Sequence, residues 1–82
     1  MEINKVSSFV HTNTNDIAQK EVEQWLDHGY KLGATHAVLY FDRFDNTRAM
    51  SYVFQPNTLD ELIDRLKRDG QTIYQAWQYD RN

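Results

Sequence analysis

The stretch THAVLYFDRFDNTRAMSYVFQ, residues 35–55, is the longest apolar-rich run of the chain, and it decides the fold. Its pattern predicts two β-strands folded about Asp45-Asn46, because Asp and Asn tolerate the positive φ that a two-residue hairpin turn requires. Such a turn places Phe44 opposite Thr47 and so sets the register of both strands. The further cross-strand pairs are then Phe41 with Met50, Leu39 with Tyr52 and Ala37 with Phe54.

The predicted register gives the hairpin two different faces, because successive side chains of a strand point to opposite sides. One face is assigned to the core beneath the helices and carries Ala37, Leu39, Phe41, Met50, Tyr52 and Phe54. The other face carries Val38, Tyr40, Ser51 and Val53. A slip by one residue would set Phe41 against Ala49 and Leu39 against Ser51. That register opposes large apolar groups with small or polar ones, and it is rejected.

The composition predicts one globular domain, residues 1–82, with 40% hydrophobic residues and a net charge of −3. The chain has no cysteine, which excludes disulfides and thiolate metal sites. The mild acidic excess argues against a surface that neutralises phosphates. No apolar run approaches the ~20 residues that span a bilayer, and the N-terminus lacks the pattern of a signal peptide. We therefore expect a soluble cytoplasmic protein without a membrane partner.

Two further elements precede the hairpin. Alternating residues predict a first strand over about residues 4–11. A helix follows, capped by Asn15 or Asp16, and Gly29 is predicted to end it because glycine adopts a left-handed conformation without steric cost. The apolar stripe of this helix has helical spacing and consists of Ala18, Val22, Trp25 and Leu26.

Two more elements follow the hairpin. Thr58 and Glu61 have the spacing of a capping box and predict a helix over residues 59–68 that ends at Asp69-Gly70. The apolar stripe of this helix is Leu59, Leu62, Ile63 and Leu66. Residues 72–79 predict a last strand. Its side chains divide into Ile73, Gln75, Trp77 and Tyr79 on one face and Tyr74, Ala76 and Gln78 on the other.

The resulting order, β-α-β-β-α-β, is typical of a ferredoxin-like sandwich, an α+β fold with an antiparallel sheet and two helices on one face. In that arrangement the first and third strands are central. If the first strand does not form, the fold reduces to a smaller α+β arrangement around the hairpin.

No motif for catalysis, metal binding or a cofactor stands out, and none of these is predicted. The three histidines are His11, His28 and His36, and no two of them have the spacing that brings metal ligands together on a helix. Asp42 and Asp45 are interpreted as turn residues near the hairpin tip. The serines lack a nucleophile elbow, and the glycines form no phosphate-binding loop.

The third predicted strand is similar to the third-strand motif of the RNA-recognition motif family. The matching residues are Arg48, Ser51, Tyr52 and Val53. The family's glycine position holds Ala49, an aromatic position holds Met50, and the final aromatic falls on Gln55. The resemblance implies single-stranded RNA stacked on the sheet. However, the predicted register turns Tyr52 into the core, and the net charge is negative. RNA binding is therefore kept as an alternative.

Two helices on one face would leave the other sheet face open and apolar, with Tyr and aliphatic side chains of the kind that anchor protein interfaces. The predicted protein-binding residues are Val38, Tyr40, Ser51, Val53, Tyr74 and Ala76. The leading hypothesis is a non-catalytic inhibitor, immunity or regulatory domain that binds another protein or a second copy of itself. An edge strand offers a further route, by pairing with a partner strand. A small dimeric enzyme with a site between sheet and helices is the third hypothesis.

Overall fold

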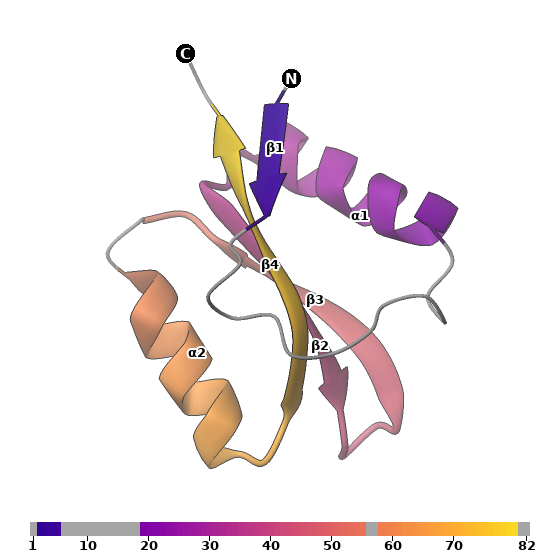
Figure 1. Cartoon of the computed structure of the whole chain (residues 1–82), viewed down its shortest axis with the longest axis vertical. Coiled ribbons are helices and arrows are strands. Elements are labelled where there is room, and N and C mark those ends of the chain that lie inside the picture. Colours follow the sequence, from indigo (N-terminus) through magenta and orange to yellow (C-terminus); the bar gives the residue numbers. More distant parts are fainter. Residues whose placement is uncertain (1, 6–18, 56–57, 81–82) are drawn as a thin grey trace.

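The computed structural model describes residues 2–5, 19–55 and 58–80. In chain order they form β1 (Glu2–Lys5), α1 (Gln19–Leu32), β2 (His36–Asp42), β3 (Thr47–Val53), α2 (Leu59–Arg68) and β4 (Thr72–Asp80) (Figure 1). The prediction of an α+β domain with an antiparallel sheet and two helices is confirmed. The predicted first strand overlaps the end of β1, and its later part lies outside the described residues.

The sheet order is β1-β4-β2-β3, and all neighbouring strands are antiparallel. The ferredoxin-like prediction, with the first and third strands central, is therefore wrong. Here β4 and β2 occupy the centre, and β3 is an outer strand. β4 is the longest strand, and its Ala76, Trp77 and Tyr79 are buried. A strand with buried side chains on both faces is suited to a central position, which explains why the last strand lies inside the sheet.

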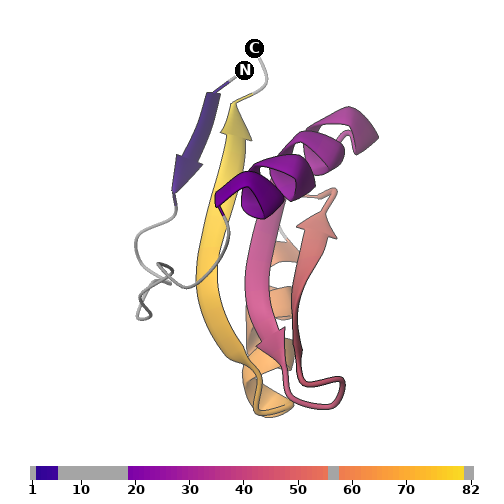
Figure 2. The same cartoon turned by 90° about the vertical axis from the view of Figure 1, so that its right-hand side faces the viewer.

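The helices cover opposite faces of the sheet, which corrects the prediction that both lie on one face (Figure 2). Val22 and Leu26 of α1 pack in one cluster with Ala37, Leu39, Trp77 and Tyr79. The apolar residues of α2 pack in the other cluster with Val38, Val53, Ile73 and Ala76. The hairpin explains this arrangement, because β2 is apolar on both faces and each face must be shielded from water by a helix.

The hairpin register differs from the predicted one by two residues. Asp42 pairs with Thr47 across a loop of residues 43–46, and Leu39 pairs with Met50 rather than Tyr52. In this loop the Asp42 carboxylate accepts the Phe44 amide at 3.0 Å, and Asn46 has a φ of 55°. These features make the longer turn favourable over a two-residue turn.

A shift of two residues leaves every side chain on its predicted face, because the strand repeat is also two. Ala37 and Leu39 are fully buried beneath α1, and Met50 and Tyr52 pack at the margin of the same cluster. Phe41 is half-buried. Phe54 is the exception, since it lies beyond the end of β3 with 53% of its surface exposed.

α1 ends at Gly33 and not at Gly29, which corrects the sequence-based boundary. Gly33 has a φ of 93° and donates to the Tyr30 carbonyl at 3.1 Å, while the Ala34 amide donates to the Gly29 carbonyl at 3.0 Å. These two bonds define a Schellman motif. The same pair of bonds ends α2 at Gly70, as the sequence predicted.

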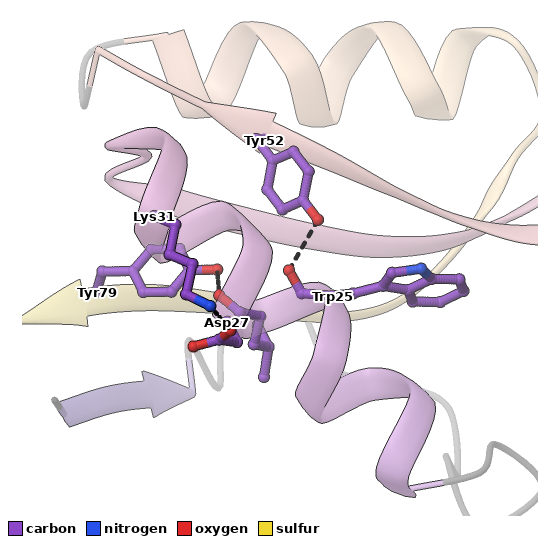
Figure 3. A network of polar contacts seen from close by, with 6 residues as sticks. Trp25, Asp27, Lys31, Tyr52 and Tyr79 are labelled. Atoms are coloured by element: carbon purple, nitrogen blue, oxygen red, sulfur yellow. Dashed lines mark hydrogen bonds and ion pairs between the residues drawn. The ribbon is translucent and has the colours of Figure 1, made fainter.

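Gly29 has a different role, because it lets α1 approach two tyrosines of the sheet. The Tyr52 hydroxyl donates to the Trp25 carbonyl at 2.7 Å, and the Tyr79 hydroxyl donates to the Leu26 carbonyl at 2.6 Å (Figure 3). A Cβ at Gly29 would lie 2.5 Å from the Tyr52 ring and 2.5 Å from the Tyr79 hydroxyl. Only glycine fits this contact. Burial raises the pKa of Tyr52, so its hydroxyl keeps the proton that it donates.

The predicted capping box does not form. The Thr58 side chain makes no cap hydrogen bond and instead donates to the Gln55 carbonyl at 2.7 Å. Asp60 and Glu61 in the first turn, and Arg65, Lys67 and Arg68 in the last, still complement the helix dipole. The helix occupies residues Leu59–Arg68 as predicted, so its apolar stripe and its charges are sufficient to define it.

Replacing Gly29 with alanine tests the contact between α1 and the two tyrosines. Helix propensity alone predicts that this change stabilises the protein by about 1 kcal/mol. We expect instead a loss of about 1–3 kcal/mol in the free energy of unfolding, because the new methyl group displaces both hydroxyls. Urea denaturation measures the difference, and Gln24→Ala on the exposed side of α1 is the control. A gain in stability from Gly29→Ala would contradict the proposed role.

Candidate functional site

The sheet face that was predicted to bind a partner is covered by α2. Val38 and Ala76 are fully buried and Val53 is 4% exposed, all three within the cluster formed with that helix. Tyr40 and Ser51 lie beside this cluster and are half-buried, with the Ser51 hydroxyl donating to the Tyr40 hydroxyl at 3.4 Å. The prediction of an open sheet face is wrong, because each helix covers one face and neither is left free.

The sixth predicted residue, Tyr74, lies on the other face. The pairing of β2 with β4 shifts after Leu39, so that Leu39 pairs with Gln75 but Tyr40 pairs with Ile73. Tyr74 is the extra residue of this β-bulge, and it packs against the cluster beneath α1. A bulge inserts one residue and so exchanges the faces of all residues on one side of it. The sequence therefore placed Ile73 and Tyr74 on the wrong faces.

The structure leaves open the outer edge of β3, the longer of the two outer strands in the described part of the chain, which we call the hairpin edge (Thr47–Val53). β3 pairs with β2 on one side and is the last strand of the sheet on the other. Among the described residues, β3 makes one backbone hydrogen bond to a segment outside the strands. The amide of Thr35, the residue immediately before β2, donates to the Val53 carbonyl. Alternate amides and carbonyls of an outer strand point away from the sheet.

A groove opens at the end of the hairpin edge, and we call it the end groove. Its volume is about 350 Å³. Residues 52–55 form one wall, and the other consists of the N-cap residue Thr58 with Glu61, Leu62 and Arg65 of α2. The lining is mixed, with aromatic and aliphatic groups beside one acidic and one basic side chain. A groove with this lining can hold a large side chain of an extended peptide.

Exposed apolar side chains lie near both ends of the hairpin edge. Phe44, in the loop before β3, is 70% exposed, and Phe54, directly after β3, is 53% exposed. The guanidinium of Arg43 lies over the Phe44 ring, 5.0 Å from its centroid. The pattern of the hairpin predicted Phe54 in the core and Phe44 within the strand pair. The signal that could have corrected both is their position, since Phe44 lies within a polar turn and Phe54 lies two residues before a proline.

The loop that carries Phe44 is held by side-chain bonds to the segment before β4. Gln71 accepts the Arg43 amide at 2.8 Å and donates to the Asp42 carboxylate at 3.1 Å. The Phe44 amide, and then Gln71, lower the pKa of Asp42 because both donate to its charged form. Asp42 was predicted to be a turn residue, and its carboxylate organises this turn. The exposed Phe44 is therefore presented on an ordered loop.

His36 lies at the other end of the hairpin, opposite Val53, and is 8% exposed. The Thr35 hydroxyl donates its proton to the Val53 carbonyl at 3.1 Å, so its contact of 3.0 Å with Nδ1 of His36 requires the ring nitrogen to donate. Burial lowers the pKa of His36. The neutral ring with its proton on Nδ1 is thus the form that the fold accommodates.

The described histidines do not assemble into a metal site. His28 lies on the exposed side of α1 with its ring 5.9 Å from that of Tyr52, and His36 is buried in β2. His11 lies outside the described residues. Within the described ranges, no group of three His, Cys, Asp or Glu residues is placed to hold an ion. The helices found there are also too short or too polar to cross a membrane.

Comparison with known proteins gives no relative for this chain: no family model, no curated protein and no solved structure matches it. The hairpin edge and the end groove are therefore the features that bear on function.

The buried His36 predicts a pH-dependent stability. Because its pKa is lowered in the folded state, the unfolded chain binds more protons below the ordinary value of 6.5. The free energy of unfolding should therefore fall as the pH falls from 7.5 through 6.5, and His36→Gln should show a smaller fall. Urea denaturation at several pH values measures both slopes, with His28→Gln as the exposed control. Equal slopes for His36→Gln and the unchanged protein would refute this assignment.

Proposed function

We propose that this protein is a non-catalytic protein-binding domain, and that its partner adds an extended segment to the sheet at the hairpin edge. The observation that carries the proposal is the outer position of β3, a seven-residue strand with no neighbour beyond it among the described residues. Main-chain hydrogen bonds along the edge supply affinity in this mode of recognition. The end groove supplies specificity, by accepting a side chain of the added segment.

The end groove supports an extended segment over other kinds of partner. It begins where β3 ends, so a strand paired with β3 would continue directly into it. Tyr52, Phe54 and Leu62 contribute apolar surface, and Glu61 and Arg65 can pair with charges at its rim. We therefore expect the partner segment to place an apolar side chain in the groove. This side chain would contribute at most about a few kcal/mol to the free energy of binding, as other single anchor residues do.

Inhibitor, immunity or regulatory roles suit a domain of this kind, because each requires binding without chemistry. The net charge of −3 would favour a basic target and would make association faster at low salt. The RNA alternative has less support. Base stacking requires an aromatic platform on an open sheet face. In this domain α1 and α2 cover opposite faces, and the Tyr52 hydroxyl is bonded to α1.

The enzyme alternative has less support as well. Its site was placed between the sheet and the helices, where the structure has buried apolar clusters. The carboxylate of Asp42 is committed to the hairpin turn, and the imidazole of His36 is bonded to Thr35.

Strand addition can be tested with peptides selected from a random dodecapeptide display library on the immobilised domain. We expect selected peptides to perturb the backbone amide NMR signals of Thr47–Val53 and of the groove residues. In an antiparallel pair only every second amide of the added strand faces the domain. N-methylation of one alternate set of peptide amides should therefore weaken binding at least about tenfold, and N-methylation of the other set should not.

The pair of N-methylated peptides is its own matched control, because the two sets differ only in which amides are blocked. Equal tolerance of both sets would refute strand addition even if the peptide binds. Selected peptides whose signals map to α1 or to β4, with β3 unaffected, would likewise overturn the proposal. Failure to select any binder from the library would count against the proposed function itself.

A further inference from the structure

The hairpin edge is complementary to itself. Phe44 is exposed at the beginning of β3, and the end groove opens at the end of β3. Phe54 and Leu32 are the other two exposed large apolar side chains among the described residues. Leu32 is the last residue of α1, and α1 ends beside the end of β3 (Figure 2). An antiparallel pair of β3 strands brings the beginning of each strand to the end of the other.

We propose that a second copy of this chain is a partner of the hairpin edge, pairing β3 with β3 in antiparallel register about Met50. This inference rests on the proposed function and names the segment that is added. Met50 is the central residue of Thr47–Val53, so pairing about it uses the full length of both strands. The two sheets join into one continuous sheet, and the contact is closed by a two-fold axis.

The register places compatible residues opposite one another. Arg48 faces Tyr52 of the second copy, Ala49 faces Ser51, and the two Met50 side chains meet at the axis. No two like charges lie opposite each other, and such a pair would destabilise the contact between the strands. Phe44 of each copy comes to the level of the end groove and Phe54 of the other. The exposed apolar groups at the two ends of the hairpin edge are covered together.

The charges of α2 also match in this arrangement. Thr58 is bonded to Gln55, so the acidic first turn of α2 lies at the end of β3. Gln71 is bonded to Arg43, so the basic last turn lies at the hairpin loop. A two-fold axis perpendicular to the sheet keeps both copies of α2 on one side and reverses one of them. Each acidic turn is then level with the basic turn of the other copy, which is favourable at low salt.

A single engineered cysteine tests both the pairing and its register, because the natural chain contains no cysteine. In Met50→Cys the two thiols would meet at the axis, where opposite Cα atoms of an antiparallel pair lie about 4.5–5.5 Å apart and can form a disulfide. Under mild oxidation we expect a covalent dimer at least about tenfold faster than from Gln78→Cys, an exposed position on β4.

Sedimentation equilibrium of the unchanged protein provides the second measurement, from roughly 10 µM to roughly 1 mM. We expect a monomer–dimer equilibrium, and Phe44→Ser should raise the dimer dissociation constant at least about tenfold while Phe44→Leu retains most of the affinity. A strict monomer throughout would overturn self-pairing, and peptide binding at the hairpin edge would still support the proposed function. A dimer that cross-links equally fast at both cysteine positions would overturn the β3 register.

Discussion

The contact of α1 with the sheet at Gly29 is the constraint on which the arrangement depends. Two tyrosines from strands on either side of β2 donate their hydroxyls to consecutive carbonyls of one helix turn. Those carbonyls already accept the bonds of the helix, and their second lone pairs are accessible because residue 29 has no side chain. The bonds fix both the height and the direction of α1 over β3, β2 and β4. The opposite face is covered by α2.

The elements of this fold could be predicted better than their arrangement in space. The apolar stripe of α2 and the alternation in β2 and β3 determine local structure directly. The predicted division of the hairpin into two faces is also correct although the predicted register is wrong, because the register differs by two residues and the strand repeat is two. The sheet order could not be obtained in this way. It depends on which strands are best buried on both faces, and β4 and β2 take the two central positions while β1 and β3 lie at the edges.

The candidate site was the part least accessible to sequence reasoning. Val38, Val53 and Ala76 were correctly seen as apolar and sharing a face, but the same property that suggested an interface makes them the surface that α2 covers. Tyr74 depends on a bulge, which leaves no clear mark in sequence. Gly29 was correctly seen as special, for the wrong reason. A glycine inside a helix indicates close approach as well as an end, and only the neighbouring strands decide between them.

The position of β4 at the centre of the sheet has a consequence for how the domain assembles. β1 pairs with β4 from Glu2 opposite Asp80, and β2 also requires β4 for its inner neighbour. These contacts span nearly the whole described chain, which favours slow folding. During synthesis the β2–β3 hairpin emerges before β4, and the edge of β2 has no strand partner until β4 leaves the ribosome. Through that interval α1 can cover one side of the hairpin, but the sheet lacks the strand that joins its two halves.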